Sequence, residues 1–263
     1  MIRGAALAAL GGVTIGVALL LLDRSSDSPP VTRPSLVAAV PADDPLAPAP
    51  APGLSIPAPR LLANGEAVSV WAPLRASAVV RAAPSSNASA LGTLPARTPE
   101  GTTNIALVTG NGVDRQALWV PVRAAGLTGW ISRAALGGYQ TVDTLLEVDT
   151  RAFTATLHRA GRVVFSAPVG VGTVDAPTPT GDFFVRNVLT RYSSAAYGPI
   201  AFGTSARSET LTDWPAGGFV GIHGTDRPDL LPGRVSHGCI RLRNIDILAL
   251  ARLMPVGTPV TIT

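Results

Sequence analysis

The sequence predicts a mainly β protein with two folded modules and one helix near its C-terminus. Between about residues 63 and 138, short apolar segments alternate with clusters of Gly, Pro, Asn and Ser, a pattern typical of a small barrel or sandwich. A second series of strand-like segments begins near Thr144, and apolar residues at helical spacing follow residue 244. At 263 residues the chain is long enough for two ordinary domains.

The N-terminal segment predicts export. Residues 5–22 form an apolar run, with Arg3 before it and Asp23 and Arg24 after it. Eighteen residues at about 1.5 Å each come close to the thickness of a bilayer core. We therefore interpret residues 1–24 as a signal anchor or a signal peptide, and either interpretation implies N-terminal membrane association and a location outside the cytoplasm.

Residues 25–62 predict a linker. This segment is rich in Pro and Ala, as in residues 48–52, which alternate the two. Repeated prolines remove backbone donors and favour extended polyproline conformations. The expected result is a semi-rigid spacer between the N-terminal segment and the folded part.

The first module, over residues 63–138, predicts a small SH3-like β-barrel. The segments Val80–Ser85, Leu91–Leu94, Trp119–Val122 and Gly129–Ile131 resemble bacterial SH3-like domains in type and order. Such domains bind ligands or act as spacers, and the sequence leaves both roles open. The expected strands are 68–71, 79–81, 91–94, 104–108, 118–122 and 128–131.

The second module, over residues 141–263, predicts a β-rich domain that ends with a helix and a short strand. A rigid loop over 177–181 contains two prolines and a glycine, and an irregular stretch over 189–218 predicts a lid or substrate wall. Asn244 is the expected N-cap of the helix. The expected strands are 145–148, 154–158, 163–169, 183–185 and 259–262.

The stretch Ser236–Arg241 contains the single cysteine of the chain. A lone thiol cannot form an internal disulfide, and an unpaired cysteine is unusual in an exported protein. The thiolate is the nucleophilic form, so a reactive cysteine needs a base or a positive charge nearby. Two histidines, His223 and His237, and Arg241 supply both kinds of group, which makes Cys239 a candidate nucleophile.

Composition argues against nucleic acid as a partner. The net charge is +4, all basic residues are arginine, and no basic run is interleaved with aromatic residues. A mild positive charge is compatible with work beside an anionic polymer.

Several separated motifs resemble the signature of L,D-transpeptidase catalytic domains. They are Ile222–Thr225 and Ser236–Leu242, with Pro177–Gly181 and the strands of 145–171 upstream. The resemblance covers about residues 141–263. It implies acyl transfer on peptidoglycan stem peptides through a cysteine thioester, without a cofactor or a metal, and covalent inhibition by carbapenems. The expected location is the periplasm or the cell wall, either membrane-anchored or secreted.

The resemblance and the local chemistry together assign catalytic roles. Cys239 is the expected nucleophile and His223 the expected general base, with the Gly224 carbonyl orienting its imidazole. His237 is expected to tune the thiolate or to help bind substrate.

Three further residues are expected to contact substrate. Arg241 carries a permanent charge that suits a stem carboxylate. Gly238 permits close approach of the backbone, and its amide and that of Cys239 are candidates for an oxyanion hole. Ser236 either binds substrate or holds the turn.

Three alternatives remain open. Water in place of an amine would make the chain an L,D-carboxypeptidase. The protein could also be a non-catalytic wall-binding protein, or a zinc hydrolase that uses His223, His237 and Cys239 as ligands.

Overall fold

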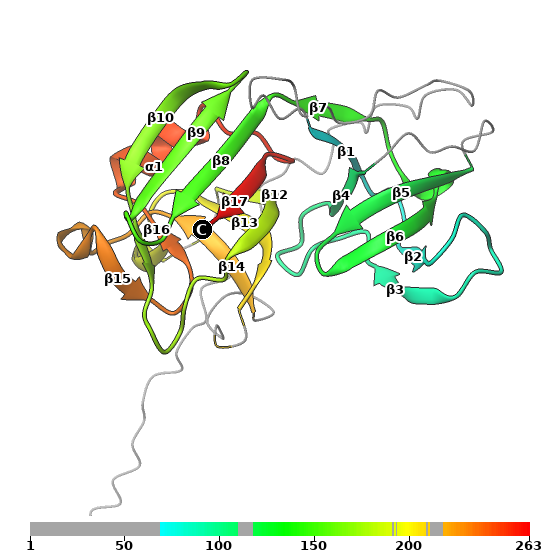
Figure 1. The fold of residues 1–263 in the computed structure, drawn as a ribbon, viewed down its shortest axis with the longest axis horizontal. Coiled ribbons are helices and arrows are strands. Elements are labelled where there is room, and N and C mark those ends of the chain that lie inside the picture. The colour runs from blue at the N-terminus through cyan, green and yellow to red at the C-terminus, as the bar shows by residue number, and fades with distance from the viewer. Residues whose placement is uncertain (1–68, 110–117, 191, 193, 209, 211–217) are drawn as a thin grey trace, which may run out of the picture. The chain divides into compact units, whose positions relative to one another are not determined.

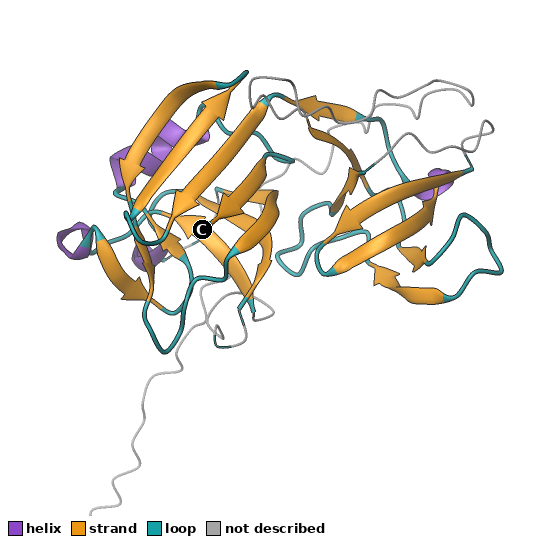
Figure 2. Ribbon diagram, in the orientation of Figure 1, coloured by secondary structure: helices purple, strands orange, loops and turns teal. Residues whose placement is uncertain are grey.

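The computed structural model describes residues 69–109, 118–190, 192, 194–208, 210 and 218–263, all within one compact unit. β-Strands dominate these residues, and the one α-helix among them lies near the C-terminus (Figures 1 and 2). The predicted fold class, mainly β with one C-terminal helix, is therefore confirmed.

The first module forms a seven-stranded antiparallel sheet with the order β3-β2-β6-β5-β4-β1-β7. Each of the six segments expected there forms a strand within its described part. The seventh strand was not predicted and extends the sheet to Val142, beyond the predicted boundary at residue 138. The bounds are β1 Ser69–Pro73, β2 Ala78–Arg81, β3 Ala90–Leu94, β4 Ile105–Val108, β5 Trp119–Ala124, β6 Leu127–Ser132 and β7 Gln140–Val142.

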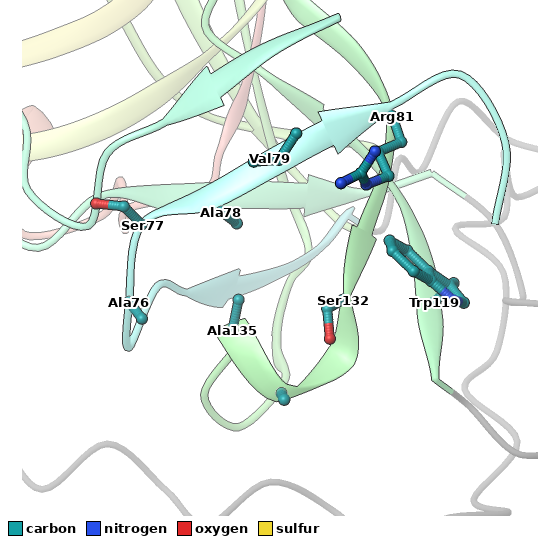
Figure 3. Close-up of a pocket in the computed structure, with 9 residues that line it drawn as sticks. Ala76, Ser77, Ala78, Val79, Arg81, Trp119, Ser132 and Ala135 are labelled. Atoms are coloured by element: carbon teal, nitrogen blue, oxygen red, sulfur yellow. The ribbon is translucent and has the colours of Figure 1, made fainter. Parts of the chain in front are cut away.

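Alternating apolar residues on these strands build a core of their own. Val80, Val122 and Ile131 are fully buried in it, as expected for strands with one apolar face. A shallow pocket of about 360 Å³ opens beside this core, and its lining combines an indole, a guanidinium group and two serine hydroxyls (Figure 3). The SH3-like assignment of this module stays a prediction.

The second module forms a ten-stranded mixed sheet with the order β10-β9-β8-β17-β12-β13-β14-β16-β11-β15. Its buried core takes apolar residues from most of these strands and from the helix. The bounds are β8 Thr144–Asp149, β9 Thr154–Arg159, β10 Arg162–Pro168, β11 Gly170–Gly172, β12 Gly181–Leu189, β13 Ala201–Arg207, β14 Phe219–His223, β15 Gly233–Ser236, β16 Ile240–Arg241 and β17 Pro259–Ile262.

The predicted irregular stretch over 189–218 is partly wrong. Residues 201–207 form β13, which pairs with β12 on one side and β14 on the other. Small residues such as Gly203 and Thr204 give this strand a weak apolar pattern, yet most of its residues are buried because it is central. Residues 201–207 are therefore a strand because they lie between β12 and β14 in the sheet, and not because of a local sequence pattern.

The helix α1, Asn244–Ala251, buries Ile247 and Leu250 in the core of the second module. The expected N-cap is wrong by one position, because Arg243 is the N-cap and no side chain caps the helix. The side chain of Asn244 instead accepts a hydrogen bond from the amide of Thr225 at 2.9 Å.

The predicted signal segment (1–24) and linker (25–62) lie outside the described residues. No helix within the described part of the chain is long and apolar enough to span a membrane.

Candidate active site

Two neighbouring strands bring the predicted catalytic residues together. β14 and β16 run parallel, with Ile222 opposite Ile240 and His223 opposite Arg241. His223 and Arg241 therefore lie on one face of the sheet. Cys239 directly precedes β16 and shares a buried cluster with Tyr197, whose ring packs on that of His223. The two motifs that contain these strands therefore meet on one face of the sheet.

Cys239 is buried, with 4% of its surface exposed. The backbone N–H of Gly221 donates to its Sγ over 3.3 Å. An N–H directed at sulfur favours the thiolate relative to the thiol, because a hydrogen bond to the charged form stabilises it.

The turn before the thiol is held by Ser236. Its hydroxyl donates to the carbonyl of Cys239 over 2.6 Å and accepts from the amide of Gly238 over 3.1 Å. Gly238 has φ +121°, a conformation that favours glycine. Ser236 thus acts within the turn, and its predicted contact with substrate stays a prediction.

Thr178, from the loop over 177–181, supports the same turn and was not identified as a site residue from the sequence. Its hydroxyl donates to the carbonyl of Gly238 over 2.9 Å and accepts from the amide of Gly172 over 2.8 Å. Because the partners lie 60 and 6 residues away, only the fold shows that this loop fixes the cysteine turn.

His223 is buried, and its Nδ1 lies 2.6 Å from the carbonyl oxygen of Gly224. A carbonyl accepts, so Nδ1 carries the proton and Nε2 is left as the acceptor of a neutral ring. The pKa of His223 is lowered to about 3, chiefly by burial. The hydrogen bond to Gly224 opposes this, and the charge of Arg241 adds to the lowering. The imidazole is therefore neutral at neutral pH.

This burial predicts that acid destabilises the folded chain. The pKa of a histidine in the unfolded chain is about 6.5, whereas that of folded His223 is about 3. Between these two pH values the unfolded state binds a proton that the folded state does not bind, and this favours unfolding. Above pH 6.5 both states leave the ring neutral and the free energy of unfolding does not depend on this group. As the pH falls from 6.5 to 3, the free energy of unfolding decreases by about 5 kcal/mol. Urea unfolding between pH 7.5 and 4 should show a flatter pH dependence for His223→Gln than for the parent. Equal slopes would contradict this account.

Two more residues of the site come from outside the predicted set. The ring of Tyr197 packs on that of His223, with 4.7 Å between centroids. Asn244 Oδ1 would lie 2.3 Å from a Cβ at Gly224, so only glycine fits between it and the strand. No local sequence pattern marks Tyr197 or Asn244 as part of the site, because tyrosines and asparagines at helix starts are common in all sequences.

His237 and Arg241 differ in their surroundings. His237 is exposed at the turn, whereas Arg241 is half-buried between β14 and β11. Among the described residues, Nε of Arg241 is buried with no hydrogen-bond partner. A buried N–H of this kind is costly unless something accepts from it, which makes Arg241 the better candidate for an anion contact.

Within the described part of the chain, no group of three or more His, Cys, Asp or Glu side chains is placed to hold a metal ion.

Comparison with known proteins decides the family. The model of the L,D-transpeptidase catalytic domain, YkuD, matches residues 143–262. The L,D-transpeptidase YkuD of Bacillus subtilis is 34% identical over 122 residues, which span 46% of this chain and 67% of the relative. Its namesake in Bacillus licheniformis is 35% identical over 129 residues, 48% of this chain and 71% of the relative.

The chain belongs to the L,D-transpeptidase family. Among solved structures, the L,D-transpeptidase C442S mutant of Enterococcus faecium matches at 24% identity and a TM-score of 0.37, over 46% of this chain and 49% of that one. Bd1075 of Bdellovibrio bacteriovorus matches at 27% identity and a TM-score of 0.37, over 46% and 48%. The chain thus covers about half the length of these two structures, and the L,D-transpeptidase assignment rests on the sequence relatives.

Proposed function

We propose that this chain is a cysteine-dependent acyltransferase that acts on peptidoglycan stem peptides. The observation that carries the proposal is the placement of Cys239 in a chain of this family. Its Sγ receives the N–H of Gly221, which lies two residues before neutral His223 on β14. A thiol, a neutral imidazole oriented by a carbonyl and a directed N–H are the groups that nucleophilic acyl transfer needs.

In the first half-reaction, Nε2 of His223 takes the proton from Sγ, and Sγ attacks the carbonyl carbon of the third stem residue. The tetrahedral intermediate collapses by breaking the bond to the terminal D-alanine nitrogen. The imidazolium returns its proton to that nitrogen, so the amine leaves neutral and a thioester remains on Cys239.

In the second half-reaction, an amine of a neighbouring stem attacks the thioester carbonyl. Nε2 of His223 takes the proton that the amine loses, the carbon–sulfur bond breaks, and the thiolate recovers a proton from the imidazolium. A new amide bond joins the two stems, and the enzyme returns to its resting state.

The oxyanion of each intermediate needs N–H donors. Of the two amides expected to supply them, that of Gly238 already donates to Ser236. The amide of Cys239 is the other proposed donor, and Gly238 also contributes the turn that presents it.

Arg241 is the proposed anchor for a stem carboxylate, because its guanidinium lies on the reacting face and its Nε is a buried donor. His237 is exposed at the same turn, and we propose that it helps to bind the substrate. Carbapenems, whose strained ring carries an electrophilic carbonyl, are proposed to acylate Cys239 in place of the stem peptide.

The location and the N-terminal module are also part of the proposal. We propose that the chain works in the cell envelope, associated with the membrane through its N-terminal segment. Its apolar run over residues 5–22 and the external location of the polymer support this. The pocket lined by Trp119 and Arg81 is a candidate wall contact of the first module.

Product analysis separates the transferase from its rivals. Stem tetrapeptides incubated with the protein should give free D-alanine together with cross-linked dimers, detected by mass spectrometry. Trimmed monomers without dimers would favour the carboxypeptidase. Unchanged peptides, with normal sedimentation of the protein on sacculi, would favour the wall-binding protein, and activity lost on chelation would favour the zinc hydrolase.

A further inference from the structure

The loop between β3 and β4 buries a carboxylate against the sheet that carries the thiol. The side chain of Glu100 is 0% exposed, and its Oε1 accepts from Nη2 of Arg186, itself 2% exposed, over 3.0 Å. Its Oε2 accepts from Nδ2 of Asn187 over 3.0 Å. Both oxygens are thus engaged by donors from β12.

An irregularity in β12 lets consecutive residues face this loop. The register with β13 shifts between Val185 and Asn187, and both Arg186 and Asn187 are buried. In a regular strand the two side chains would point to opposite faces. Nδ2 of Asn187 also lies within 3.2 Å of the hydroxyls of Thr98 and Thr102. The loop therefore supplies the acceptors for this side-chain amide group.

Hydrogen bonds continue from this ion pair to the thiol. Nε of Arg186 donates to the carbonyl of Thr204 over 2.7 Å, and the hydroxyl of Thr204 donates to the carbonyl of Val220 over 2.7 Å. Val220 directly precedes Gly221, whose N–H donates to Sγ of Cys239. Three strands, β12, β13 and β14, therefore connect Glu100 to the reacting sulfur.

A second contact follows the same route. The guanidinium carbon of Arg186 lies 3.7 Å from the ring centroid of Phe219, and that of Arg207 lies 4.0 Å from it. Phe219 begins β14 and shares a buried cluster with Cys239. Burial lowers the pKa of Arg186, Glu100 opposes this, and Arg207 adds to the lowering. Glu100 is thus the counter-charge to Arg186, which shares the ring of Phe219 with a second cation, Arg207.

We propose that Glu100 is a positioning residue for Cys239. Its carboxylate fixes Arg186 and, through Thr204, the main chain of β14, so that the Gly221 N–H and His223 are aimed at the sulfur. The β3–β4 loop then belongs to the scaffold of the active site, and the first module is more than a spacer. The inference rests on the proposed function only in taking Cys239 as the reacting group.

The test measures the reactivity of the thiol in the full chain. Glu100→Gln keeps the shape but supplies one acceptor where two donors must be satisfied, so the scaffold should loosen. We expect the second-order rate of alkylation by iodoacetamide at pH 7 to fall at least about fivefold. In turnover with stem peptide, kcat should fall while KM changes little. Glu100→Asp should recover part of both.

The single cysteine makes the alkylation rate specific to one site. Glu147→Gln is the matched control, because Glu147 is an exposed acid of the second module whose carboxylate pairs with His158 at 2.9 Å. It should alkylate and turn over like the parent. Circular dichroism and thermal unfolding identify the temperature range in which each variant is folded.

A folded Glu100→Gln variant that alkylates at the parent's rate would overturn the proposal and leave Glu100 with a purely structural role. If Glu100→Gln does not fold, Thr204→Val decides, because it removes the hydroxyl link to the Val220 carbonyl, together with the acceptor of the Ala206 amide, and leaves the backbone carbonyl that accepts from Arg186 in place. Slower alkylation supports the proposal, and the parent's rate overturns it. Absence of acyl transfer by the parent would sink the proposed function separately, and the ratio of alkylation rates would still decide the role of Glu100.

Discussion

Replacing Cys239 with alanine is expected to lower the rate of acyl transfer by at least about a thousandfold, because the thioester cannot form without the sulfur. The substitution removes one atom from a buried site, so the variant should fold and keep a cooperative thermal transition. Cross-linked dimers and free D-alanine, quantified by mass spectrometry, report the loss.

His158→Gln is a suitable control for this experiment. His158 lies on β9 and forms a hydrogen bond with Glu147 on β8, and both residues are distant in sequence from the cysteine turn. It should retain the parent's rate. A Cys239→Ala variant that still releases D-alanine at a rate near the parent's would contradict the nucleophile assignment and return attention to a water-based mechanism.

His223→Gln is expected to lower kcat/KM by about 10²- to 10⁴-fold, the usual contribution of a positioned general base. Glutamine retains the volume and can still donate to the Gly224 carbonyl, but it cannot take the proton from Sγ. Stopped assays over pH 5 to 9 measure the loss. Because folded His223 stays neutral down to about pH 3, its protonation should not limit the parent's rate above pH 5.

The chain contains three histidines, and each gives a distinct expectation. His237→Gln should cost clearly less than His223→Gln, because His237 is exposed whereas His223 is buried. His158→Gln should cost nothing. If His237→Gln produced the larger loss, the base would be His237 and the role given to His223 would be wrong.

Short-range patterns were sufficient to predict most strands. Alternating residues such as Phe153 to His158 mark β9 because one face is buried and the other is not. β13 has no such alternation, since a central strand is buried on both faces, and it was therefore missed. The start of α1 was misplaced by one residue because Asn244 directs its side chain to the amide of Thr225.

Cys239, His223 and Arg241 could be chosen as candidates from the sequence because they stand within two short motifs, and their roles stay predictions. The residues that hold them could not. Thr178 reaches the cysteine turn across 60 positions, and Glu100 reaches Arg186 across 86. Threonine and glutamate are ordinary surface residues in most sequences, so only their burial against specific donors distinguishes them.

Acylation of Cys239 is the step on which the proposed mechanism depends most directly. Intact-mass spectrometry of the parent after incubation with a carbapenem, followed by peptide mapping, tests this in one experiment. We predict a mass increase of one inhibitor per chain, located on the peptide that contains Cys239 and absent in Cys239→Ala. No adduct on the folded parent, or an adduct that persists in Cys239→Ala, would contradict the account.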